Sequence, residues 1–360
     1  MTIQEQFFAL LRLSVGDSDE WSVEMQDGDW QRMYEMATKQ SLLAICFRGI
    51  SKLPEAQRPP EALCDEWLVD CHLNYEANAK AYRCVVGIQK WFKSKGFRSC
   101  VLKGQANAVM YPDKYIRTAG DIDLWVEGGT RKVLDFVRKR CPDSELCYHH
   151  VKFIDYKEIP VEVHFRPSFM NNLIDNRKMQ RYFKAVQDRQ WEHTVDLPDG
   201  IGQACVPTAD FNRIFQMGHI YRHLMQNGIG LRQIIDYYYL LRQGFTEEER
   251  ERDARLFRSM NMYRIAGAVM YIEKTVLGLD DRYLIVPVNR KAGRALLKEI
   301  MLAGNFGYHD ERVGHNAYAG TLMKNIQRLY RDLLFVFSYP GECLWEPIFR
   351  LYHFFWRKLI

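Results

Sequence analysis

The chain has 360 residues, of which 47% are hydrophobic and 26% are charged, so its composition is that of an ordinary soluble globular protein. These values exclude the fibrous, disordered and membrane-spanning classes, and the length accommodates one elaborated domain or two smaller ones. The formal net charge of +5 is mildly basic. It suits an anionic ligand but gives no strong signal for nucleic acid.

The nine cysteines are an odd number, lie scattered between Cys46 and Cys343, and include no Cys-x-x-Cys spacing. The sequence therefore indicates neither a disulfide framework nor a zinc site. The first residues of the chain include acidic side chains and lack a long apolar core, which is not the pattern of a signal peptide. A cytoplasmic location is expected.

Apolar periodicity divides the chain into three regions. Residues 1–95 have helical spacing, interrupted by the Pro59-Pro60 pair. Residues 96–200 contain short apolar runs of strand type that alternate with two helix-like stretches, in the order expected of an α+β or an α/β class. After an expected loop around residues 197–210, helical periodicity returns, so residues 201–360 are predicted to form mostly a helical bundle.

Asp121 and Asp123 stand at the start of a predicted strand, in the segment RTAGDIDLWV. The period of two in a strand places both carboxylates on one face, while the apolar residues between them anchor the strand in a core. Two like charges so close together are tolerated best when a divalent cation bridges them. The alternative is a half-solvated edge strand whose outward face is acidic.

A third carboxylate lies on a later predicted strand, IPVEVHF, where Glu162 and His164 share one face. Three converging carboxylates suit two magnesium ions around a triphosphate, with manganese as the alternative metal. Glu162 would then help to activate an attacking hydroxyl, and His164 is a possible substrate-lining residue. The alternative is an exposed strand face.

Lys103 and Gly104 end an earlier predicted strand, just before a helix-like stretch. Backbone N–H groups at such a place can receive a phosphate, and Lys103 would add a point charge. The alternative is a plain turn. The segment is not a P-loop, because the longer glycine pattern followed by Lys-Ser/Thr is absent.

The segments LKGQANAVMYPD, RTAGDIDLWV and VEVHF together resemble the uncharacterised nucleotidyltransferase family of the DNA polymerase beta-like nucleotidyltransferase superfamily. The resemblance implies an α+β fold, with a minimal nucleotidyltransferase mixed sheet, flanking helices, N-terminal helices and a C-terminal helical bundle. It implies that Asp121 and Asp123 bind magnesium and that Glu162 is the third carboxylate. It also implies that Lys103-Gly104 opens the phosphate loop.

Gln105, Arg117 and Gly120 complete the expected nucleotide-binding set. The guanidinium fork of Arg117 can pair with phosphate oxygens, or alternatively with an acid. Two features depart from the superfamily pattern, which usually has Gly-Gly or Gly-Ser where this chain has Gly104-Gln105, and often Asp in place of Glu162. These departures leave open a non-catalytic nucleotide- or partner-binding protein that retains the fold.

Three side chains of the helical half, His219, His223 and Arg232, are possible substrate-lining residues. His219 and His223 lie four residues apart on a helix, as a metal pair would, but no Glu follows His219 and no third ligand is evident. A structural or substrate-lining role is therefore favoured. Arg232 and Asp236 are also four apart and are expected to form a helix ion pair near the cleft.

The sequence thus predicts a magnesium-dependent nucleotidyltransferase that moves a nucleoside monophosphate from a triphosphate, ATP by default, to an unidentified acceptor hydroxyl with release of pyrophosphate. The C-terminal stretch mixes aromatic residues with Arg350, Arg357 and Lys358. Such a pattern is more often a helix packed on its own bundle than a peripheral membrane contact. A membrane-surface component of surface-polysaccharide synthesis is a third class.

Overall fold

The computed structural model describes residues 1–16, 21–310, 312 and 321–360. Four strands form a mixed sheet in the order β1-β2-β4-β3. They are β1 (Ser99–Val101), β2 (Ile122–Val126), β3 (His150–Lys152) and β4 (Val161–His164). Each lies within one of the predicted apolar runs, and with the surrounding helices they confirm the α+β class.

Strands β2 and β4 run parallel in the middle of the sheet, with β1 and β3 antiparallel on the outer sides. The register sets Asp123 opposite Glu162. Opposite residues on neighbouring strands point to the same face of a sheet. The pairing therefore brings carboxylates from two distant segments side by side.

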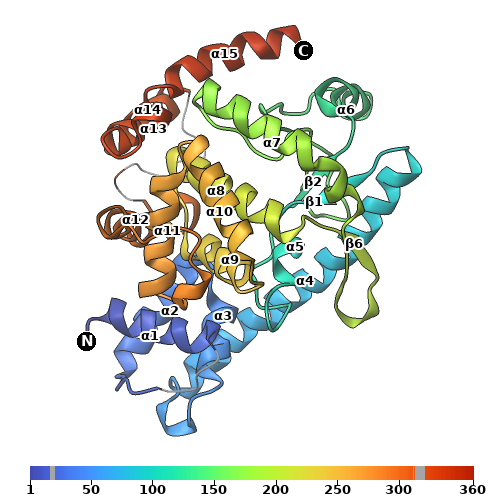
Figure 1. The fold of residues 1–360 in the computed structure, drawn as a ribbon. Coiled ribbons are helices and arrows are strands. Elements are labelled where there is room, and N and C mark those ends of the chain that lie inside the picture. Colours follow the sequence, from blue (N-terminus) through green and yellow to red (C-terminus); the bar gives the residue numbers. More distant parts are fainter. Residues whose placement is uncertain (17–20, 311, 313–320) are drawn as a thin grey trace.

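Helix α4 (Glu61–Ser94) begins directly after the Pro59-Pro60 pair, as expected where a helix starts. Leu63 and Trp67 at its beginning belong to the hydrophobic core of the helical regions. Tyr82 and Phe92, further along, belong to a second core that lies against the sheet. Figure 1 shows α4 as one long helix that connects these two parts of the molecule.

The helices before residue 95 confirm the predicted helical start of the chain. They are α1 (Ile3–Val15), α2 (Asp27–Gln40), α3 (Leu43–Ile50) and the 3-10 turn η1 (Glu55–Gln57), in addition to α4. Helices α5 (Gln105–Ala108) and α6 (Gly129–Arg138) lie in the two helix-like stretches predicted among the strands, and α7 (Leu173–Glu192) follows β4. Helix α1 begins at a capping box, in which Thr2 accepts from the backbone of Glu5 and the Glu5 side chain accepts in return.

The second half is helical, as predicted. Its elements are α8 (Ala209–Gln226), α9 (Leu231–Leu241), α10 (Glu247–Ser259), α11 (Tyr263–Thr275), η3 (Asp281–Tyr283), α12 (Arg290–Ala303), η4 (Asn305–Gly307), α13 (Thr321–Phe335), α14 (Pro340–Cys343) and α15 (Glu346–Leu359). Helices α8 to α11 contact one another in the middle of the molecule, and α13 to α15 follow one edge (Figure 1).

The loop expected around residues 197–210 is in part a small hairpin. Strands β5 (Thr194–Asp196) and β6 (Gln203–Cys205) pair antiparallel around the turn η2 (Pro198–Gly200). Each strand has only three residues, too few to show a period of two in the sequence. The prediction of a plain loop was wrong at β6 for this reason.

The division of the chain at residues 95/96 and 200/201 remains a prediction. The hydrophobic packing crosses the first of these boundaries, because the second half of α4, from residue 79 onward, belongs to the same hydrophobic core as the sheet. Phe349 and Trp356 of α15 reach the same core from the end of the chain. Among the described residues, no helix is long and apolar enough to cross a membrane.

Candidate active site

The loop before β2 sets the position of the acidic pair. The Asn78 amide of α4 donates to the carbonyl oxygens of Tyr115 and Arg117, at 2.9 and 2.7 Å. The carbonyl oxygen of the same side chain accepts from Gln105, at 3.0 Å. A buried amide that satisfies several backbone groups fixes the chain it contacts. Asn78, which the sequence analysis did not single out, therefore holds the segment that leads to Asp121.

Asp123 lies at the centre of a charged cluster and is only 2% exposed. Its Oδ1 lies 2.8 Å from Nζ of Lys103 and 2.9 Å from Nε2 of His164. Burial opposes ionisation of Asp123, but these two donors outweigh it and hold the pKa of its carboxyl well below the usual range. Asp123 is therefore a carboxylate near neutral pH.

Glu162 stands beside Asp123 on β4. Its Oε2 lies 3.1 Å from Nδ1 of His150 and 3.6 Å from Nε2 of His164. Burial raises the pKa of Glu162, but the contact with His164 has the larger combined effect and the pKa is lowered. The ligand atoms of Asp123, Glu162 and His164 lie within 4.8 Å of one another, close enough to hold one metal ion.

Asp121 differs from its two neighbours because it lines an open pocket and makes no ion pair among the described residues. Desolvation and repulsion by Asp123 raise its pKa to about 6, although Lys103 acts in the opposite direction. The raised pKa reflects in part the repulsion between two neighbouring carboxylates. A divalent cation bound between Asp121 and Asp123 would neutralise this repulsion.

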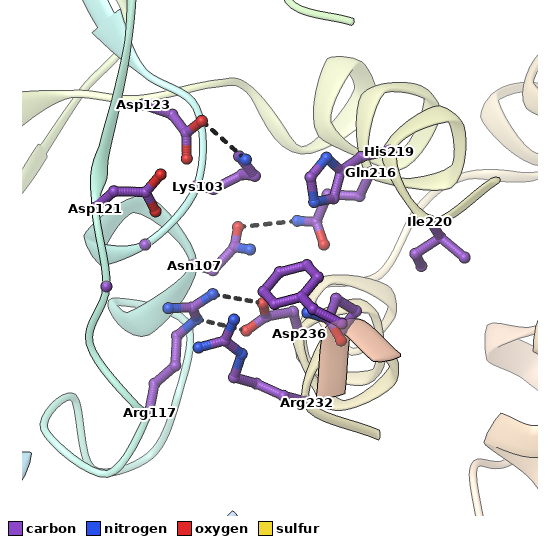
Figure 2. A pocket seen from close by; sticks show the side chains of 14 residues that line it. Lys103, Asn107, Arg117, Asp121, Asp123, Gln216, His219, Ile220, Arg232 and Asp236 are labelled. Carbon is purple, nitrogen blue, oxygen red and sulfur yellow. Dashed lines mark hydrogen bonds and ion pairs between the residues drawn. The ribbon is translucent and has the colours of Figure 1, made fainter. Parts of the chain in front are cut away.

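The pocket beside these carboxylates is narrow, with a cavity volume of about 40 Å³. Figure 2 shows the acidic pair and Lys103 on one wall, with residues of α8 and α9 opposite. Its lining consists of Lys103, Gly104, Asn107, Arg117, Gly120, Asp121, Asp123, Gln216, His219, Ile220, Arg232, Gln233, Asp236 and Phe306. The pocket is thus lined by the sheet region on one side and by helices on the other.

Asp236 forms its ion pair with Arg117 and not with Arg232, so the expected helix pair was wrong. Nε and Nη2 of Arg117 donate to the two carboxylate oxygens of Asp236, at 2.8 and 2.9 Å, and Tyr111 donates to Oδ1 at 2.7 Å. A bidentate pair from another element has a better geometry than two side chains on one helix turn. This pair joins the loop before β2 to α9.

Arg232 consequently lines the pocket as a buried cation without a carboxylate. Among the described residues it makes no ion pair, and its Nε has no hydrogen-bond partner. Burial and then repulsion by Arg117 lower its pKa to about 10, so it still carries its charge at neutral pH. Its guanidinium lies 5.3 Å from the ring centre of Phe306. An unbalanced buried charge of this kind indicates an anionic ligand.

His219 and His223 are not arranged as a metal pair. Nη2 of Arg222 lies 3.3 Å from Nδ1 of His219 and 3.0 Å from Nε2 of His223. A guanidinium can only donate, so both ring nitrogens accept and their lone pairs are occupied. The remaining proton of His219 is then on Nε2. Its ring points into the pocket in Figure 2, whereas His223 lies against Phe306.

His219 is therefore a neutral hydrogen-bond donor toward the pocket. Burial, followed by repulsion from Lys103, lowers its pKa well below the usual value. Arg222 also contacts His149, so the guanidinium is surrounded by three imidazoles. Arg222 and His149 were not recognised in the sequence, because no short motif connects α8 with β3.

The other expected residues lie in two different environments. Gly104 and Gly120 line the pocket. Gly104 has a φ of +58°, which favours glycine, whereas a Cβ at Gly120 would meet no protein atom within 4 Å. Gln105 points away from the pocket to Asn78, and His164 is 1% exposed beneath the carboxylates. Neither of these two side chains lines the pocket.

Several pocket residues were missed by the sequence analysis: Asn107, Gln216, Ile220, Gln233, and Asp236 as the partner of Arg117. Asn107 accepts from Gln216 at 2.9 Å, which connects α5 to α8. Phe306 has a φ of +53°, a conformation that is unusual for a bulky residue.

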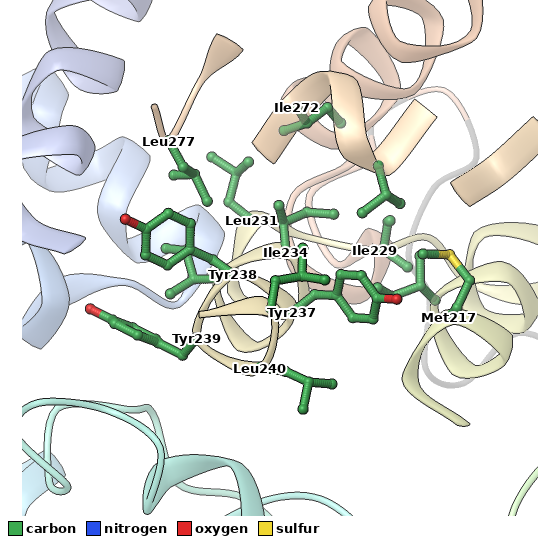
Figure 3. Packing of buried hydrophobic residues seen from close by; sticks show 14 of the residues in the cluster. Met217, Ile229, Leu231, Ile234, Tyr237, Tyr238, Tyr239, Leu240, Ile272 and Leu277 are labelled. Carbon is green, nitrogen blue, oxygen red and sulfur yellow. The ribbon is translucent and has the colours of Figure 1, made fainter. Parts of the chain in front are cut away.

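All residues of helix α9, which carries Arg232 and Asp236, are buried. Figure 3 shows Leu231, Ile234 and Tyr238 within a cluster that also contains Ile272 of α11 and Leu277. Such packing fixes the backbone, so the positions of Arg232 and Asp236 are fixed as well.

A comparison with protein families matches the model of the uncharacterised nucleotidyltransferases over residues 26–278 of the chain. The protein therefore belongs to this family, and the resemblance noted in the sequence is confirmed. No curated protein matches the chain. The matched range includes both walls of the pocket except Phe306, which lies beyond it.

We expect Asp236→Ala to destabilise the protein by about 3–5 kcal/mol, because it leaves Arg117 buried without a counter-charge. The side chains of Arg117 and Asp236 are 7% and 4% exposed. Urea unfolding measures the loss. Glu251→Ala is the matched control, since its pair with Arg255 is exposed and its loss should cost less than about 0.5 kcal/mol. Equal losses would contradict the structural role of the buried pair.

Asp121→Asn should stabilise the metal-free protein clearly at pH 8 but little at pH 4. The folded protein raises the pKa of Asp121 from 3.8 to about 6, so the contribution of Asp121 to stability is fully present below about pH 3.8 and is lost as the pH rises to about 6. Asparagine avoids this loss, with a gain of about 1 kcal/mol after allowing for solvent screening. Thermal unfolding at both pH values measures it, with Asp135→Asn on α6 as the exposed control.

Proposed function

We propose that this protein is a magnesium-dependent nucleotidyltransferase that transfers a nucleoside monophosphate from a triphosphate, ATP by default, to an acceptor hydroxyl with release of pyrophosphate. Its family suggests nucleotidyl transfer in general. The observation that carries the proposal is the opposition of charges across one pocket. Asp121 and Asp123 lie on one wall, and the unpaired Arg232 lies on the other. A metal-bound triphosphate supplies both missing counter-charges at once.

Asp121, Asp123 and Glu162 would hold the metal. Their donor atoms are carboxylate oxygens, which suit Mg²⁺, or Mn²⁺ given the nearby His164 nitrogen. The raised pKa of Asp121 supports this fit, because it reports a carboxyl group without a cation. Two bound ions would neutralise the triphosphate and lower the pKa of the attacking hydroxyl.

The residues of the chain itself would bind and orient the triphosphate. Lys103 can turn from Asp123 to a phosphate oxygen, and Arg232 can form a bidentate contact from the opposite wall. His219 would donate Nε2–H to an oxygen of the phosphate chain. The bare backbone of Gly104 and Gly120 allows close approach. Preorganised donors of this kind stabilise charge without reorganisation.

Glu162 would accept the proton of the acceptor hydroxyl. It is ionised near neutral pH, since its pKa is below the usual value.

Two expected nucleotide ligands act indirectly in this proposal: Arg117 through its pair with Asp236, and Gln105 through Asn78. The helical region 201–360 would shape the acceptor pocket beside the core of residues 96–200, with residues 1–95 as support. The nine free thiols suit the cytoplasmic location that we propose.

A non-catalytic nucleotide-binding protein is the second candidate. The observation that favours it is the ion pair of Lys103 with Asp123, which neutralises an expected metal ligand without a metal. Pyrophosphate release with each of the four triphosphates and magnesium separates the two candidates. Binding without release, over a range of hydroxyl acceptors, would favour the non-catalytic protein.

We expect Asp123→Asn to reduce metal-dependent pyrophosphate release by about a thousandfold or more, because it removes a shared metal ligand. The control is Asp135→Asn, which changes an exposed carboxylate of α6 in the same way. Isothermal titration with magnesium and a non-hydrolysable triphosphate measures binding in parallel. Unchanged metal-dependent binding in the double variant Asp121→Asn, Asp123→Asn would refute the site.

Arg232→Met should weaken triphosphate binding by about tenfold to a hundredfold and reduce its salt dependence, because one charge-assisted contact is lost. Methionine keeps the apolar stem, so the fold should be retained. Arg255→Met on the exposed face of α10 is the control. If both variants bind the triphosphate equally well, Arg232 is not a ligand.

A further inference from the structure

The last helix, α15, carries two different apolar stripes. Phe349 and Trp356 are 5% and 8% exposed and pack into the core against the sheet. A second stripe recurs at intervals of three and four residues and faces solvent. It consists of Ile348, Leu351, Tyr352, Phe355 and Leu359. Because the helix already packs through the first stripe, the second one is not needed for folding and marks an interaction surface.

The neighbouring α13 has the same character at its end. Leu329, Leu333 and Phe337 are exposed, and Phe337 reaches 93%. Helices α13, α14 and α15 follow one edge of the molecule in Figure 1. Large exposed side chains therefore concentrate in the final segment of the chain.

Helix α6, which carries exposed basic side chains, lies next to the end of α15. Arg138 of α6 donates to the carbonyl oxygen of Ile360 at 2.6 Å, which sets α6 beside this end. The exposed basic residues of α6, of the two residues that follow it and of α15 are Arg131, Lys132, Lys139, Arg140, Arg357 and Lys358. Within the described part of the chain none of these six forms an ion pair, and Asp135 is the one acid of α6. The apolar stripe is thus flanked by uncompensated positive charge.

We propose that α15, together with the basic residues of α6 and the two basic residues that follow it, binds the surface of an anionic lipid membrane. The apolar stripe would enter the boundary of the acyl chains, and the basic residues would contact the phosphate headgroups. Arg350 and His353 in the middle of α15 fit a helix that lies in the interface and does not cross it. A protein partner would also cover the stripe, but it gives no reason for the unpaired basic flank.

Co-sedimentation of the full chain with vesicles tests the proposal. We expect binding to phosphatidylcholine vesicles that contain about one-third phosphatidylglycerol, and little binding to pure phosphatidylcholine. Leu351→Ser with Phe355→Ser should reduce the partition coefficient at least about tenfold. The matched control is Leu68→Ser with Leu73→Ser, two equally exposed leucines of α4.

The basic flank has its own variant. Lys139→Glu with Arg140→Glu should weaken binding to anionic vesicles by more than about tenfold, in a salt-sensitive way. Arg294→Glu with Lys298→Glu on α12 is its control. Circular dichroism and thermal unfolding verify that each variant is folded.

Equal sedimentation of the α15 variant and its α4 control would overturn the proposal. So would a dimer, detected by light scattering, that the α15 variant dissociates while no vesicle binding occurs. The proposal does not depend on nucleotidyl transfer. Pyrophosphate release without vesicles measures that activity separately, so failure of either proposal can be recognised.

Discussion

The parallel pairing of β2 with β4 is the constraint on which the site depends. It sets the buried Asp123 beside the half-buried Glu162, with the more exposed Asp121 two residues away. Like charges at such distances repel strongly when little solvent screens them. The chain offsets part of this repulsion with Lys103 and His164. Among the described residues Asp121 makes no ion pair, and repulsion by Asp123 contributes to its raised pKa.

The helical wall of the pocket carries a positive charge without a counter-charge. Arg232 lines the pocket, is buried and forms no ion pair with a carboxylate among the described residues. A buried charge without a counter-charge destabilises the folded protein. Its presence therefore indicates a ligand that supplies the counter-charge. The two imbalances face each other across the pocket, so a ligand that combines a cation with a polyanion relieves both. This complementarity is stronger support for a metal-bound triphosphate than either wall alone.

Rigid packing allows these charges to be held apart without collapse of the pocket. Helix α9 is buried on all sides, and its Asp236 pairs with Arg117 from the loop before β2. Asn78 of α4 holds the same loop from the other side. The sheet and the helical half are thereby connected through polar contacts at the pocket itself. A change in either half is expected to alter the distance between the acidic and the basic wall.

The sequence by itself determined the α+β class, the strands around Asp123 and Glu162, and the family, because periodicity and short motifs are local properties. It did not determine the partner of Asp236 or the donor role of His219. These depend on contacts between segments far apart in the chain, where distance and burial decide which charges meet. Arg232 shows the difference, since its spacing predicts a pair with Asp236 on one helix turn. Only the tertiary structure decided that Arg117, with its better bidentate geometry, takes that carboxylate and leaves Arg232 facing the pocket.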